Sequence, residues 1–214
     1  MATFDRLAVI DLETTGLDPA TGLILEVGVV VVDPALQEIA HHSVLLADAA
    51  AVAWAEAAHR READGAELDV PERMHLASGL VSDIVDPVRF LTGEGGPLRR
   101  VVARTPADAE SAICAFLDAQ GIAERLPLAG SSVRSLDGPF LAAHMPTLFS
   151  RFTHRTIDAS ALSEFARFVD PTGHGEIMGA VPSAGHRTIG DCRRSIEILR
   201  RFASHYGIGA ITVI

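Results

Sequence analysis

The stretch VIDLETTGLD, residues 9–18, places two carboxylates two positions apart in an apolar run with high β-strand propensity. Side chains on a strand alternate between faces, so Asp11 and Glu13 project from the same side, about 7 Å apart along the backbone. Two ionised carboxylates at that spacing repel each other, and burying them unpaired is costly. A hard divalent cation, Mg²⁺ or Mn²⁺, is the usual remedy because it prefers oxygen ligands. A solvated acidic pair on an edge strand is the alternative interpretation.

The surrounding pattern predicts an α/β domain. β-Branched and apolar runs predict strands at 6–12, 24–33 and 38–46, and their short connections favour antiparallel neighbours. Later segments predict two short strands, at 126–130 and 154–158. They also predict helices at 47–63, 105–120, 137–145 and 160–169, and a last helix from 189 onward. The Gly- and Pro-containing segments 86–104 and 170–185 are predicted to be loops.

The composition excludes some classes of function. The 214 residues suffice for one domain with a sizeable core, and the formal net charge of −10 argues against a long basic groove for duplex nucleic acid. Bound cations can still supply positive charge locally for a nucleic-acid substrate. Cys114 and Cys192 lack paired spacing, which favours reduced thiols and a cytoplasmic location. No apolar stretch reaches transmembrane length, so no membrane partner is expected.

Two more acids and a histidine lie far along the chain. Asp137 follows GSSVRSL at 130–136, and Asp191 lies in AGHRTIGDCRRSI at 184–196, five residues after His186. Five residues on a continuous helix leave two side chains on different faces, so His186 must lie on the loop ahead of the helix if both reach one site. The alternatives are a helix N-cap for Asp137, a surface charge for Asp191 and a structural role for His186.

Taken together and in order, DLETTGLD (11–18), GSSVRSLD (130–137) and HRTIGD (186–191) resemble the three motifs of the DEDDh family of 3′–5′ exonucleases. MHLASGL (74–80) and THRTIDASAL (153–162) are similar to segments of its oligoribonuclease branch. The resemblance covers about residues 7–202. It implies a single ribonuclease H-like domain with a mixed β-sheet and helices on both faces, and a homodimer.

The resemblance also implies the site residues. Asp11, Glu13, Asp137 and Asp191 would hold two divalent cations, Mg²⁺ or Mn²⁺, and His186 would be the general base. The residues implied to hold a short single-stranded RNA substrate and its 5′ phosphate are Leu17, His75, Ser132, Arg155 and Ser160. A planar guanidinium suits phosphate, and apolar or aromatic contacts suit bases. Core packing is the alternative for Leu17, and a helix N-cap is the alternative for Ser160.

The chain also departs from the family pattern. His154 stands where a tyrosine usually precedes the phosphate-binding arginine, which is Arg155 here. Leu136 is one residue more than the family pattern has before Asp137. Segments 58–70 and 86–104 are interpreted as loop insertions. The expected activity is hydrolysis of short oligoribonucleotides, down to dinucleotides, to nucleoside 5′-monophosphates. The first alternative is a broader exonuclease acting on single-stranded DNA or longer RNA, with LRRVVAR (98–104) extending its binding surface. The second is a nuclease-like module that binds nucleotides or partners without catalysis.

Overall fold

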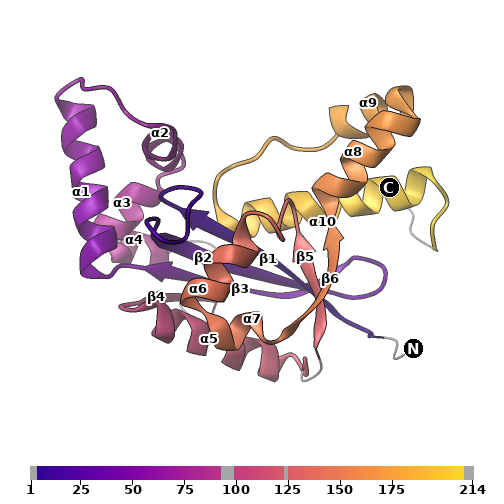
Figure 1. Ribbon diagram of the computed structural model, residues 1–214, viewed down its shortest axis with the longest axis horizontal. Helices are drawn as coiled ribbons and strands as arrows, with labels where there is room; N and C mark the ends of the chain where they lie inside the picture. Colours follow the sequence, from indigo (N-terminus) through magenta and orange to yellow (C-terminus); the bar gives the residue numbers. More distant parts are fainter. Residues whose placement is uncertain (1–3, 93–98, 123–124, 210–214) are drawn as a thin grey trace.

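A computed structural model describes residues 4–92, 99–122 and 125–209 of the chain (Figure 1). Its strands are β1 (Leu7–Thr14), β2 (Ile24–Val32), β3 (Glu38–Leu46), β4 (Arg100–Ala103), β5 (Leu126–Gly130) and β6 (Phe152–Asp158). Its helices are α1 (Ala49–Ala63), α2 (Val70–Ala77), α3 (Leu80–Val85), α4 (Pro87–Leu91), α5 (Pro106–Ala119), α6 (Asp137–His144), α7 (Pro146–Phe149), α8 (Ala159–Val169), α9 (Pro171–Gly179) and α10 (Thr188–His205).

The strands form one mixed sheet in the order β4-β3-β2-β1-β5-β6. The first three strands form an antiparallel meander, as their short connections predict. β5 runs parallel to β1, β6 parallel to β5, and β4 parallel to β3. The strand that carries the paired acids therefore lies inside the sheet, between β2 and β5, and the edge-strand interpretation is wrong.

Helices cover both faces of this sheet (Figure 1). The alternation along β1 sends Ala8 and Ile10 into a core shared with α5, α6 and α7. It sends Leu7 and Val9 to the opposite face, where they pack with Cys192 of α10. Asp11 and Glu13 continue the second row, so the strand period aims both acids at α10.

A separate hydrophobic cluster lies at one end of the sheet. Alanines of α1 pack with Leu25 of β2, Leu45 of β3 and Phe90 of α4. Figure 1 shows α1 to α4 gathered at this end, with α8 to α10 at the other. Within the described ranges, no helix combines the length and apolar character needed to cross a bilayer.

Two segments predicted as loops contain regular structure. In 86–104, Pro87 begins α4 with Asp86 as its N-cap, and β4 pairs with β3; residues 93–98 of this segment lie outside the described residues. In 170–185, Pro171 begins α9, whose N-cap Asp170 accepts a hydrogen bond from the Gly173 N–H at 2.9 Å. The loop predictions are wrong for α4, β4 and α9. Proline at the first helical position starts both helices.

Candidate active site

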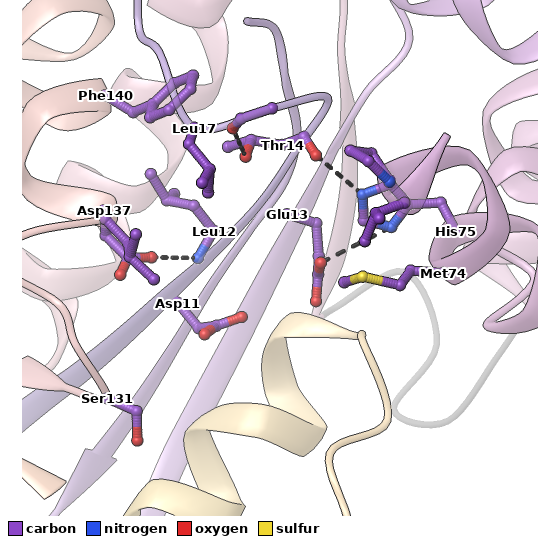
Figure 2. A pocket seen from close by; sticks show the side chains of 14 residues that line it. Asp11, Leu12, Glu13, Thr14, Leu17, Met74, His75, Ser131, Asp137 and Phe140 are labelled. Atoms are coloured by element: carbon purple, nitrogen blue, oxygen red, sulfur yellow. Dashed lines mark hydrogen bonds and ion pairs between the residues drawn. The ribbon is translucent and has the colours of Figure 1, made fainter. Parts of the chain in front are cut away.

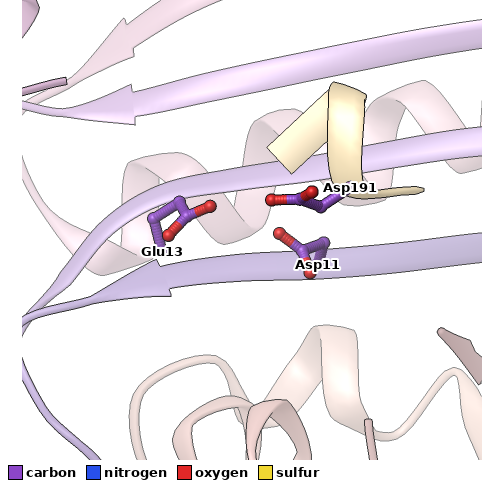
Figure 3. A group of neighbouring side chains, drawn as sticks. All are labelled: Asp11, Glu13 and Asp191. Carbon is purple, nitrogen blue, oxygen red and sulfur yellow. The ribbon is translucent and has the colours of Figure 1, made fainter. Parts of the chain in front are cut away.

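Three carboxylates converge where β1 meets α10. Oxygens of Asp11, Glu13 and Asp191 all lie within 4.8 Å of one another (Figure 3). Gly28, opposite Asp11 on β2, permits the approach of α10, because a Cβ there would lie 2.3 Å from the Thr188 Oγ1 atom. The first turn of α10 is thereby pressed onto the sheet, and it carries Asp191 into the cluster.

Asp137 adjoins this cluster from the other side of β1. Its Oδ1 atom accepts a hydrogen bond from the Leu12 N–H at 2.8 Å (Figure 2). It is the first residue of α6 and its side chain bonds to β1, so the N-cap interpretation is wrong. Its negative charge contributes to raising the pKa of Asp11.

Burial and mutual repulsion disfavour the ionised carboxylates. Desolvation, followed by the charges of Glu26 and Asp191, raises the pKa of Glu13 to about 8. Desolvation raises the pKa of Asp137 to about 7, and desolvation followed by the charge of Asp137 raises the pKa of Asp11 well above its ordinary value. Charge compensation by a hard divalent cation fits this set of oxygen donors.

His186 lies on the loop directly before α10, where the sequence predicted it. It lines a cleft of about 210 Å³ together with Asp11, Glu13 and Asp191. Its φ of 52° is in the left-handed region, which is uncommon for a residue other than glycine. The N–H of the preceding Gly185 donates to Asp191 Oδ1 at 3.1 Å, so the loop and the acidic cluster are joined directly.

A second, larger cleft of about 530 Å³ opens beside the acids (Figure 2). Asp11, Glu13 and Asp137 lie along it, and the rest of its lining is mainly apolar: Leu17, Val70, Pro71, Met74, Leu136 and Phe140. Leu17 is 79% exposed, so the core-packing interpretation of this residue is wrong. An apolar cleft ending in carboxylates can hold a flat apolar group next to a cation-bound phosphate.

His75 also lines the larger cleft, but it is only 1% exposed. Its Nε2 atom lies 2.9 Å from the Thr14 carbonyl oxygen, which can only accept, so Nε2 carries a proton. Its Nδ1 atom lies 3.7 Å from Glu13 Oε2, and its ring meets the Trp54 ring edge-on. The hydrogen bond to Thr14 holds the end of β1 from the side of α2.

The remaining predicted substrate residues lie on three segments: Ser132 in the loop after β5, Arg155 on β6 and Ser160 on α8. The N–H groups of Ser132 and Ser160 donate to Asp158 Oδ1, at 3.0 and 2.9 Å. Asp158 is the N-cap of α8, so the N-cap interpretation of Ser160 is wrong. The Arg155 side chain is exposed on β6. Ser132, Arg155 and Ser160 are not among the described residues that line the two clefts.

Sequence reasoning missed two features of the site. Ser131 lines both clefts, and its hydroxyl lies 2.7 Å from that of Ser195. Glu26 is the register partner of Glu13 and is 2% exposed. The signal for Glu26 was present, because it is the lone acid in the β-branched run ILEVGVVVV (24–32).

Comparison with known proteins places this chain in a family. No protein-family model matches the chain. The oligoribonuclease of Halorhodospira halophila is 34% identical over 206 residues, which are 94% of each chain. The oligoribonuclease of Hahella chejuensis is 32% identical over 208 residues, which are 96% of this chain and 97% of the relative. The chain belongs to the oligoribonuclease family. The family predicted from the sequence is confirmed.

Solved structures identify the fold of this oligoribonuclease-family chain. Exonuclease I from Methylocaldum szegediense superposes with a TM-score of 0.59 at 16% identity, covering 92% of this chain and 40% of that one. The zinc-bound complex of Escherichia coli exonuclease I with single-stranded DNA gives a TM-score of 0.58 at 11% identity, covering 96% of this chain and 42% of that one. The chain thus spans about two-fifths of these nucleases. The predicted ribonuclease H-like fold is confirmed, and family and fold make this protein a nuclease.

Proposed function

We propose that this protein removes nucleoside 5′-monophosphates from the 3′ end of short oligoribonucleotides, down to dinucleotides. Water adds to the phosphorus, the bond to the 3′ oxygen of the preceding nucleotide breaks, and that oxygen leaves as a hydroxyl. Family membership supports the reaction class. The single observation that carries the proposal is the convergence of Asp11, Glu13 and Asp191 beside an apolar cleft.

The donor set fits two divalent cations, Mg²⁺ or Mn²⁺. Asp11, Glu13 and Asp191 would hold them, with Asp137 completing the set from α6. When bound, such ions acidify water and stabilise charge on the departing oxygen. His186, on the loop at the rim of the cluster, accepts the proton of the attacking water, and an imidazole suits this task near neutral pH.

The larger cleft supports binding of the terminal nucleoside. Leu17 projects from the loop after β1, and Met74 and Phe140 add apolar surface on either side. These side chains would pack against bases without distinguishing them, since every base has an apolar face. Arg155 would hold the 5′ phosphate of a short substrate through its planar guanidinium, assisted by Ser132 and Ser160. Its guanidinium is exposed on β6, beyond the two clefts.

We further propose a cytoplasmic homodimer. Phe165, Phe168 and Val169 of α8 are 63%, 86% and 54% exposed, and a second copy would cover this apolar surface. Cys114 and Cys192 are both buried and free, as expected for a reducing compartment. Sedimentation of Phe168→Glu beside the unchanged chain tests the dimer, because the variant should sediment as a monomer.

A broader exonuclease on single-stranded DNA is the second candidate, suggested by the arginines of LRRVVAR. Those arginines are engaged within the fold instead. Arg99 Nη1 lies 3.1 Å from His41 Nδ1, and Arg100 and Arg104 donate to carbonyl oxygens of Phe90 and Ala47 at 3.1 and 2.9 Å. They therefore offer little support for an extended strand-binding surface, and the short-RNA proposal is favoured.

Chain-length profiling tests the proposal. Labelled RNA and DNA from dimers to about twenty-mers are incubated with Mn²⁺, and the products are resolved by length. RNA dimers and trimers should disappear fastest, releasing 5′-monophosphates, and chelation should stop the reaction. Asp11→Asn is the matched inactive control. Cleavage that stalls at dimers, or a preference for long DNA, would favour the second candidate, and no metal-dependent release at all would favour a non-catalytic module.

A further inference from the structure

Arg187, the residue directly after His186, joins three distant segments of the chain. Its Nε atom donates to Glu26 Oε2 of β2 at 2.9 Å. Its Nη1 atom donates to Asp83 Oδ2 of α3 at 2.8 Å. One planar guanidinium thus ties the loop before α10 to the sheet and to the helices at the end of the sheet.

This ion network is largely buried. The side chains of Glu26, Asp83 and Arg187 are 3%, 11% and 26% exposed. Glu26 also accepts a hydrogen bond from the Ser43 hydroxyl at 2.6 Å, and the Arg187 guanidinium carbon lies 5.9 Å from the centre of the Phe90 ring. Buried charges with partners on several elements are fixed in place, because losing one partner leaves another charge buried and unpaired.

The loop that Arg187 anchors is strained at His186. A left-handed φ at a residue with a Cβ persists only where the surroundings hold it. Here the residue is held from both sides. On one side the Gly185 N–H donates to Asp191 Oδ1, and on the other Arg187 is fixed by Glu26 and Asp83.

Direct phosphate binding by Arg187 does not fit these contacts. Its Nε and Nη1 atoms already donate to carboxylates of β2 and α3. Arg187 is also absent from the described residues that line the two clefts. The positive charge of Arg187 also acts directly on Glu13, lowering its pKa against the other causes that raise it. The paired hydrogen bonds, in contrast, act on the loop, and their influence on catalysis passes through the residue before Arg187.

We infer that Arg187 is a positioning residue for the general base, with Glu26 and Asp83 as its anchors: their paired hydrogen bonds hold His186 in its left-handed conformation at the rim of the acidic cluster. The inference rests on the proposed function, since it requires His186 to accept a proton. A misplacement of about 1 Å at a reacting group lowers rates by about a hundredfold, so loosening this anchor should affect turnover more than substrate binding.

A double-mutant cycle tests the inference. Arg187→Lys keeps the positive charge but lacks the rigid planar fork that donates to the two carboxylates from separate nitrogens. Asp83→Asn weakens one anchor without removing a residue of the cluster. Each change is made in the unchanged chain and in His186→Ala, and kcat and KM are measured on an RNA dinucleotide with Mn²⁺. Arg89→Ala is the matched control, because Arg89 also lies near Asp83, at 3.6 Å, but its side chain is 61% exposed.

We expect Arg187→Lys and Asp83→Asn to lower kcat about tenfold or more, with KM within about twofold, when His186 is present. In His186→Ala the same changes should lower kcat no more than about twofold, because a residue that acts through another has nothing left to position. Arg89→Ala should be within about twofold of the unchanged chain. In the metal-free protein, the ¹H–¹⁵N signals of the His186 imidazole should shift in Arg187→Lys and not in Arg89→Ala.

Equal losses of kcat in both backgrounds would overturn the inference, since they would show that Arg187 supports the fold as a whole. Unshifted imidazole signals in Arg187→Lys would also overturn it. Full activity of His186→Ala itself would instead remove the general base from the proposed function, and the inference with it. The two failures are therefore distinguishable.

Discussion

Replacing Glu13 with glutamine should stabilise the metal-free protein at alkaline pH. Burial, Glu26 and Asp191 raise the pKa of Glu13 from 4.5 to about 8. Each pKa unit corresponds to about 1.4 kcal/mol, so the ionised form destabilises the folded state by up to about 5 kcal/mol. A neutral glutamine of the same shape removes this penalty. We expect Glu13→Gln to raise the free energy of unfolding by about 1–5 kcal/mol at pH 9.

The sign of the pH dependence follows from the raised pKa. Between pH 4.5 and about 8 the folded protein keeps a proton on Glu13 that the unfolded chain has lost. The free energy of unfolding of the unchanged protein therefore falls as pH rises through this window, by about 1.4 kcal/mol per pH unit for this one proton. The variant lacks that contribution, so the two proteins should be alike below pH 4.5 and differ most above pH 8.

Urea unfolding in the presence of a chelator, followed by Trp54 fluorescence at pH 5 and pH 9, measures the effect. Glu38→Gln is the matched control. In the unchanged protein the hydrogen bond from Arg193 lowers the pKa of Glu38, which is the opposite direction from Glu13. That change should instead destabilise the protein at neutral pH, with the difference disappearing in acid. A Glu13→Gln variant no more stable than the unchanged protein at pH 9 would refute the assignment of Glu13 to a strained, buried acidic cluster.

Three further changes test the site. Asp11→Ala should abolish hydrolysis and weaken Mn²⁺ binding measured by calorimetry, while circular dichroism stays that of a folded chain; full activity would contradict the site assignment. Leu17→Ala should raise KM for dinucleotides and leave the unfolding free energy within about 0.5 kcal/mol, with the exposed Val88→Ala as a control that changes neither. Gly28→Ala should cost about 1–3 kcal/mol in urea unfolding and also weaken Mn²⁺ binding, since its Cβ would displace Thr188; unaltered Mn²⁺ binding would show that α10 adapts.

The sequence predicts the parts of the site that depend on local periodicity. A strand repeats every two residues, so the shared face of Asp11 and Glu13 follows from their spacing alone, and β1 bears this out. The loop position of His186 follows equally from the period of the helix after it. The convergence of Asp191 on β1 could be anticipated only through the family motifs, because 180 residues of chain separate it from Asp11.

Contacts between distant segments escaped prediction. Nothing in the order of residues shows that Arg187 meets Glu26 and Asp83, since that pairing depends on the docking of α10 and α3. Local composition misled at α9, where one proline and three glycines suggested a loop although Pro171 occupies the first turn and Asp170 caps it. The exposure of Leu17 was likewise undecided, because an apolar residue after a strand fits a core and a cleft equally well.

Anomalous diffraction from crystals grown with Mn²⁺ and a non-hydrolysable dinucleotide is the most direct measurement of the central claim. We expect two manganese peaks bound by carboxylate oxygens of Asp11, Glu13, Asp137 and Asp191, with the His186 imidazole beside them. Manganese density elsewhere, or none between these four acids at millimolar Mn²⁺, would contradict it.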